Sequence, residues 1–145
     1  MKKILSNHLV GIIPLLLCIA IITIGFLSMD SNAKLQGNAR IINYTGIIRG
    51  ATQRLIKQEL NHEPNDALID ELDRTLHGLL SGDEEAHITR LDQMEYQELL
   101  AEMEKEWADI KKEILQYRSS GNNKNRLYAL SEQYFAMADE AVDIA

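Results

Sequence analysis

Hydrophobic residues form one long unbroken run near the N-terminus and then recur at helical spacing through the rest of the chain. Residues 9–28, LVGIIPLLLCIAIITIGFLS, contain no charged side chain. At about 1.5 Å per residue, a helix of this length crosses the roughly 30 Å apolar core of a bilayer. We therefore predict a transmembrane helix over residues 9–28, which divides a short N-terminus, residues 1–8, from a larger domain, residues 31–145.

The charges that flank this run predict its orientation. Lys2 and Lys3 precede it, and Asp30 follows it. The excess of basic residues on the inner side of a membrane then places the N-terminus in the cytoplasm and residues 31–145 outside it. A cleaved signal peptide is the alternative, with a cleavage site at Ser31-Asn32-Ala33. The apolar run exceeds the roughly 7–15 residues of the apolar region of a signal peptide, which favours an uncleaved anchor.

Four helices are predicted after this run. The first, about 32–60, carries two stripes, and one can face a bundle core while the other faces a partner chain. The first stripe is Leu35, Ala39, Ile42, Gly46, Arg49, Gln53, Ile56 and Leu60, and the second is Ile41, Ile48, Thr52 and Leu55.

The remaining helices are separated by clear breakers. Asn61-His62-Glu63-Pro64 ends the first helix, and a short helix over about 66–81 ends at Ser81-Gly82. An acidic loop follows, and then Asp92 and Glu95 resemble a capping box at the start of a helix over about 92–119. A turn over 119–123 leads to a helix over about 124–145. Four helices with short connections predict an all-α fold, an antiparallel up-down-up-down four-helix bundle.

Composition narrows the class of protein further. The chain has 145 residues, 26% of them charged and only 6% aromatic, which suits a helical bundle. All 22 acidic residues lie at or beyond Asp30, and removing Lys2 and Lys3 from the 15 basic residues leaves 13 there, a balance of −9. Such a surface repels nucleic acid, so we exclude nucleic-acid binding. The single cysteine, Cys18, lies in the apolar run and forms no internal disulfide.

The stretch 43–60, NYTGIIRGATQRLIKQEL, is unusual for an amphipathic helix. It places two glycines, Gly46 and Gly50, and two arginines, Arg49 and Arg54, within a helical pattern. Each glycine costs a helix about 1 kcal/mol relative to alanine, and an arginine on an apolar stripe needs a counter-charge or a ligand. Arg49 and Arg54 are five residues apart, about 140° round the helix, so they do not face one point. We therefore expect Arg54 to pair with a carboxylate of its own bundle.

This stretch resembles the sensory domains of bacterial nitrate/nitrite sensor kinases and of type IV pilus methyl-accepting chemotaxis transducers. Their first helix carries the pattern N-x-x-G-x-x-R-x-x-x-x-R-[LM], which Asn43, Gly46, Arg49, Arg54 and Leu55 meet here. The triplet Thr52-Gln53-Arg54 also resembles the Ser-Gln-Arg of the chemotaxis transducers. The resemblance covers about a dozen residues closely, and otherwise extends to the layout of anchor, long helix and bundle.

The resemblance implies a homodimer with a small anion between its first helices. Arg49 matches the arginine that meets its symmetry mate across the dimer and holds the anion, and Gly46 matches the glycine that lets the backbone approach it. Paired guanidinium groups present planar donor forks to an oxyanion. We add Asn43, Gly50 and Arg54 to the predicted ligand-binding set. Nitrate sensors carry a larger residue where this chain has Gly50, so the identity of the ligand does not follow.

Structural interpretations stand beside these functional ones. Arg49 and Arg54 could form ordinary ion pairs, and Gly46 and Gly50 could serve close helix packing. Asp83, Glu84, Glu85 and His87 lack defined ligand spacing, which favours a solvated loop over a metal site. The aromatic residues Tyr96, Trp107, Tyr117 and Tyr134 lie on apolar stripes and are expected in the core. We find no nucleophile–base pair, phosphate loop or zinc spacing, so neither enzymatic activity, a cofactor nor a metal is expected.

The sequence therefore favours an extracytoplasmic ligand-sensing module of a bacterial membrane signalling protein, of the histidine kinase, diguanylate cyclase or chemoreceptor type. The last helix reaches Ala145 without a terminator, which leads us to expect a second span and an output domain downstream. A truncated reading frame or a genuinely short protein would also end in this way. The alternative function is a stand-alone, single-span helical protein with a structural or partner-binding role.

Overall fold

The computed structural model describes the backbone from Lys2 to Ala145 and the side chains of residues 12, 14–29, 31 and 35–145. This part of the chain forms four helices: α1 (Lys2–Leu60), α2 (Asp66–Ser81), α3 (Met94–Ser120) and α4 (Lys124–Ile144). It contains no strand, and its one β-bridge joins Asp83 to Ile88. The chain divides into two compact units, Met1–Gln36 and Gly37–Ala145, which we describe separately.

In the unit Met1–Gln36, the residues from Lys2 onward form the first part of α1. Among the described residues, no helix is both long enough and apolar enough to cross a membrane. The transmembrane helix predicted over residues 9–28 is thus not confirmed, and residues 9–11 and 13 of it have side chains outside the described part. The described large apolar side chains from Ile12 to Met29 are each more than half exposed, from 52% at Ile12 to 71% at Met29.

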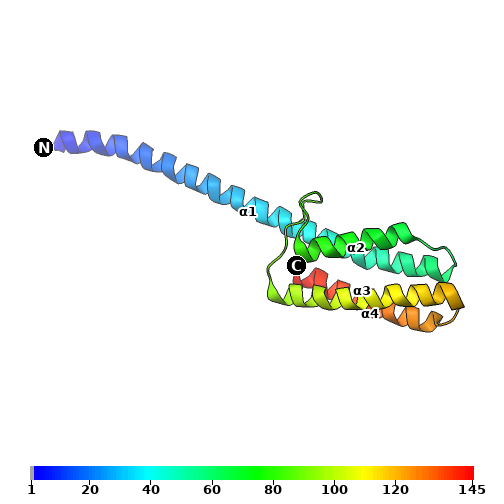
Figure 1. Cartoon of the computed structure of the whole chain (residues 1–145). Coiled ribbons are helices and arrows are strands. Elements are labelled where there is room, and N and C mark those ends of the chain that lie inside the picture. Colours follow the sequence, from blue (N-terminus) through cyan, green and yellow to red (C-terminus); the bar gives the residue numbers. More distant parts are fainter. Residues whose placement is uncertain (1) are drawn as a thin grey trace. The chain divides into compact units, whose positions relative to one another are not determined.

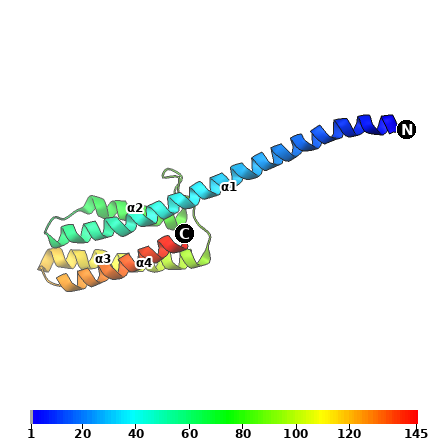
Figure 2. The same cartoon turned by 180° about the vertical axis from the view of Figure 1, so that it is seen from behind.

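The unit Gly37–Ala145 is a four-helix bundle made of residues 37–60 of α1 together with α2, α3 and α4. Successive helices run in opposite directions, as both views show (Figures 1 and 2), so α4 ends beside the part of α1 that enters the bundle. The predicted all-α bundle is confirmed. The predicted bounds 66–81 match α2, and α4 begins at the predicted residue and ends at Ile144.

The start of α3 differs from the prediction. Asp92 does not cap this helix, because its carboxylate accepts a 2.7 Å hydrogen bond from Nη1 of Arg90 instead. The helix begins at Met94, after Gln93, whose side chain makes no capping bond. The long loop 82–93 therefore ends in a surface ion pair rather than in a capping box. By contrast, Oδ1 of Asn65 accepts a 3.0 Å bond from the Leu68 amide and caps α2.

The core stripe of α1 is the second of the two predicted stripes. Its members are buried at 4-3-4-3-4 spacing: Ile41, Thr45, Ile48, Thr52, Leu55 and Glu59. On the first predicted stripe only Ile56 is buried, whereas Leu35 and Ile42 are exposed and Arg49 lies between these extremes. Since side chains at this spacing share one helix face, α1 presents a face with both glycines away from the core.

Helix α3 supplies three of the four aromatic residues that were expected in the core. On α3, Tyr96, Leu100, Met103, Trp107, Ile110, Ile114 and Tyr117 are buried. Tyr134 of α4 joins them, so all four aromatic residues expected in the core are found there. Gly121 ends α3 at φ 66°, a left-handed conformation that costs a glycine little, and its amide donates to the Tyr117 carbonyl at 2.8 Å.

Charged residues tie the helices together at the end of the bundle where α1 turns into α2. Arg118 of α3 donates from Nε and Nη2 to the Glu59 carboxylate at 2.8 and 2.6 Å, and from Nη1 to Asp66 at 2.6 Å. The Glu59 side chain is only 1% exposed. This hydrogen bond to Glu59 is the main cause that raises the pKa of Arg118, so the guanidinium stays charged. A buried carboxylate is tolerated here because it is paired on both oxygens.

Candidate ligand-binding surface on helix α1

Four of the five predicted site residues lie on one outward face of α1. Asn43, Gly50 and Arg54 are exposed, and Gly46 is half-buried beside them. Their spacing of three or four residues places all four on one side of the helix, away from the buried stripe. The structure therefore brings together Asn43, Gly46, Gly50 and Arg54 along one line.

The two glycines leave the backbone of this face open. Apart from the adjacent backbone of α1 itself, a Cβ atom built on Gly46 or on Gly50 would meet no atom within 4 Å. Neither glycine is therefore required for packing inside the bundle, which removes one structural interpretation of both residues. A helix stripe without side chains lets another backbone or a small ligand approach closely. We call the face made of Asn43, Gly46, Ile47, Gly50 and Arg54 the open face of α1.

Arg49 lies to one side of the open face and is held by α4. Its guanidinium forms an ion pair with Asp139 and lies over the Phe135 ring, with Cζ 5.5 Å from the ring centre. The Arg49 side chain remains 36% exposed and that of Asp139 52%. An ion pair this exposed contributes at most about 1 kcal/mol, so an incoming anion could compete with Asp139 for Arg49.

The carboxylate partner that we expected for Arg54 is found at Arg49 instead. Arg54, expected to pair with a carboxylate of its own bundle, forms no ion pair among the described residues, whereas Arg49 has such a partner. Asp139 and Phe135 are the residues that sequence reasoning missed. They lie four residues apart on α4, away from the residues that this helix buries, and this spacing was the only signal that could have pointed to them.

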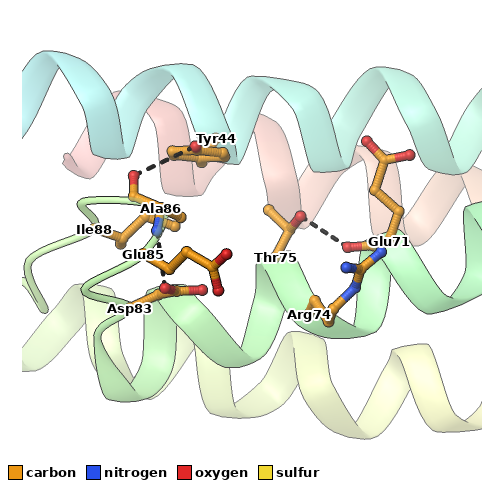
Figure 3. A pocket seen from close by; sticks show the side chains of 8 residues that line it. All are labelled: Tyr44, Glu71, Arg74, Thr75, Asp83, Glu85, Ala86 and Ile88. Carbon is orange, nitrogen blue, oxygen red and sulfur yellow. Dashed lines mark hydrogen bonds between the residues drawn. The ribbon is translucent and has the colours of Figure 1, made fainter.

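An acidic cavity of about 430 Å³ lies between α1, α2 and the loop 82–93 (Figure 3). The side chains that line it include Tyr44, Glu71, Arg74, Asp83 and Glu85. One carboxylate oxygen of Asp83 is already hydrogen-bonded, because its Oδ1 accepts a 2.9 Å bond from the Ala86 amide. In the part of the chain that the structure describes, no group of three His, Cys, Asp or Glu side chains could hold a metal ion.

Gly78, which the sequence did not single out, holds the loop beside this cavity against α2. A Cβ atom there would lie 3.2 Å from Cδ1 of Ile88 and 3.3 Å from Cβ of Asp83. Asp83 and Ile88 also exchange backbone hydrogen bonds at 2.9 and 2.7 Å. The loop can therefore pack closely against α2 because Gly78 has no side chain in the way.

The family comparison decides what kind of domain this is. Residues 31–133 match the family described as the type IV pili methyl-accepting chemotaxis transducer N-terminal domain, PilJ, over more than half of the chain. The chain belongs to the PilJ family. It is therefore a sensor domain of the chemoreceptor type, as the resemblance of residues 43–55 implied.

The fold of this PilJ domain is also found in a solved structure. The ligand-binding domain of the P. aeruginosa nitrate receptor McpN aligns with a TM-score of 0.65 and 18% identity, over 72% of this chain and 92% of that one. At this identity the similarity concerns the fold. No curated protein matches this PilJ chain.

Proposed function

We propose that this PilJ chain is the extracytoplasmic ligand-sensing input module of a bacterial membrane signalling protein. Its own residues contribute no catalysis in this role, and an output domain elsewhere would carry the response. The chemoreceptor-type family supports this role, and the exposed apolar surface of α1 from Ile12 to Met29 supports an apolar environment around that segment. Attachment to the membrane through residues 9–28 stays a prediction from the sequence.

The open face of α1 is the proposed site of dimerisation and ligand binding. Two copies that met through this face would place two bare glycine stripes against each other, where helices can approach closely. Arg49 and Arg54 flank that stripe and would supply the positive charge for a small anion, with Asn43 as a neutral donor. The single observation that carries the proposal is the empty space beside Gly46 and Gly50.

Thermal unfolding of the full 145-residue chain with nitrate, nitrite, sulfate, phosphate and acetate tests this function. A ligand that binds only the native state raises the melting temperature, and we expect at least one of these anions to do so. Arg49→Ala should abolish the shift. Arg90→Ala is the matched control, because it also removes an exposed ion pair, that with Asp92. Sedimentation of the same samples should give a dimer.

A structural or partner-binding role is the second candidate, and the ion pair between Arg49 and Asp139 favours it. In that role Arg49 only joins α1 to α4. In that case no anion would change the melting temperature, and Arg49→Ala would not change the oligomeric state.

A further inference from the structure

A second positively charged surface lies within one protomer, between the last turns of α1 and the first turns of α4. It is a groove of about 610 Å³, within the range of small-molecule sites. Its apolar part comes from Ile56, Leu60 and Tyr128, and its charged part from Arg54, Lys57 and Lys124. We call it the basic groove.

The charge of the basic groove is opposite to that of the molecule. Among the described residues that line it, three are cationic and none is acidic, although the chain as a whole carries −7. A carboxylate outside the lining, that of Glu132, accepts a long 3.4 Å bond from Nε2 of the lining residue Gln53. None of the three cations takes part in an ion pair found in the described region. Their charge is therefore free to attract a ligand.

The helix ends do not cancel this charge. α4 begins at Lys124 with no acidic residue in its first turn and no side-chain cap, and α1 ends nearby at Leu60 with Lys57 in its last turn. The partial charges of the two ends, about +0.5 and −0.5, oppose each other. The three full positive side-chain charges then dominate, which favours an anion.

The floor of the groove favours a ligand with an apolar body. Ile56 is 2% exposed and closes the groove on the core side, and the Tyr128 ring is 55% exposed and stands open to solvent. An exposed aromatic ring beside a buried aliphatic side chain gains from covering by another apolar group. A bare inorganic anion would leave this surface uncovered.

We propose that the basic groove binds a small monocarboxylate whose body is apolar and of about the size of one aromatic ring. The carboxylate would accept hydrogen bonds from Lys124 and Lys57 or Arg54, and the body would lie between Ile56, Leu60 and Tyr128. Both walls belong to one chain, so this site needs no dimer. It goes beyond the proposed open-face site, with which it shares only Arg54.

Titration calorimetry of the full chain with benzoate tests the proposal, with benzamide as the neutral analogue and acetate as the anion without an apolar body. We expect saturable binding of benzoate, and binding of the other two weaker by roughly threefold or more, because each lacks one of the two contacts. Equal affinity for benzoate and benzamide would overturn the proposal, as would the absence of saturable benzoate binding.

Two variants locate the site. Lys124→Gln and Tyr128→Ser change exposed side chains, so both should fold, and each should weaken benzoate binding by roughly threefold or more. Lys112→Gln is the matched control, an exposed lysine of α3 outside the groove. Unchanged affinity in both groove variants would refute the site. Arg49→Ala should leave benzoate binding intact, so this proposal and the open-face site succeed or fail separately.

Discussion

Arg118 is the residue whose removal should cost the bundle most among its charged groups. It satisfies both oxygens of Glu59, a carboxylate that the rest of the fold buries. Arg118→Ala leaves that charge unpaired, and we expect a loss of about 3 kcal/mol in the free energy of unfolding, measured by urea denaturation. Asp92→Ala, which breaks only the ion pair with Arg90 that is exposed on both sides, should lose less than about 0.5 kcal/mol. Similar losses in the two variants would contradict this role of Arg118 as the partner of the buried Glu59.

Two buried tyrosines should weaken the fold at high pH. Burial raises the pKa of Tyr96 and of Tyr134 above the ordinary value of 10.0. In the unfolded chain both ionise near pH 10, so the folded state holds more protons above that pH. The tyrosines therefore do not lower the free energy of unfolding below about pH 10. Above that pH it falls by up to about 1.4 kcal/mol per pH unit for each tyrosine.

Tyr134→Phe tests this effect on its own, because the Tyr134 hydroxyl makes no hydrogen bond in the described part of the chain. We expect near-normal stability at pH 7 and a shallower decline above pH 10 in urea denaturation followed across pH. Tyr96→Phe serves for comparison, since it also removes the 2.8 Å bond between the Tyr96 and Thr45 hydroxyls. It should lose about 1 kcal/mol already at pH 7. An unchanged alkaline decline in both variants would show that other groups cause it.

At the scale of the element, the caps of α2 and α3 predict unequal costs for similar substitutions. Asn65→Ala removes a side chain that accepts from the Leu68 amide, and should cost about 1 kcal/mol. Asp92→Ala removes only a surface partner of Arg90 and should cost less than about 0.5 kcal/mol. Thermal unfolding of both variants would show the difference. A larger loss of stability for Asp92→Ala than for Asn65→Ala would support the capping box that the sequence predicted for α3.

The glycines separate two roles of small residues on helices. Gly46→Ala and Gly50→Ala meet open space and remove a helix penalty, so each should raise the free energy of unfolding of the monomer by about 0.5–1 kcal/mol. Gly78→Ala presses on Ile88 and Asp83 and should lower it. Urea denaturation distinguishes these signs. Gly46→Ala could stabilise the monomer and yet destabilise the protein at concentrations that populate a dimer. This combination would indicate that a second copy packs against the open face.

The elements themselves were largely predictable from the sequence, and the reason is local. Helix breakers act within a few residues, and three of them interrupt the periodic stretches: Asn61–Pro64, Ser81-Gly82 and the turn at Gly121. The choice between the two stripes of α1 was not predictable. Both carry large aliphatic residues, Ile42 and Ile56 on one and Ile48 and Leu55 on the other, so only packing against the other helices decides which is buried.

At the scale of the whole molecule, Arg49 couples α1 to α4. The helix geometry predicted that Arg49 and Arg54 point apart, but it could not say which one meets a carboxylate, because Asp139 lies 90 residues further along the chain. An anion that takes the Nη1 donor of Arg49 would displace Asp139 from it. Such a ligand would therefore alter the contact between α1 and α4 as it binds, which is the kind of two-state contact that a signal requires.

Asp139→Asn tests that competition. It removes the charge that occupies Arg49, and we expect the anion found in the oxyanion screen to bind more tightly, by up to about fivefold, since the exposed pair contributes at most about 1 kcal/mol. Glu132→Gln on the same helix is a control for the loss of one negative charge. Calorimetry measures both. Weaker binding in Asp139→Asn would show that Asp139 helps to position Arg49 for the anion.

The only tryptophan of the chain lies where three helices meet. The indole of Trp107 in α3 is 2% exposed, donates from Nε1 to Asp73 of α2 at 2.6 Å, and lies 6.0 Å from the Tyr134 ring of α4. Nζ of Lys111 stands 5.7 Å from its ring. Indole fluorescence responds to nearby charge and to water, so the protein carries an intrinsic optical reporter of its own helix packing. Emission from this one side chain would reveal, without any added label, whether a ligand shifts α2 or α4 against α3.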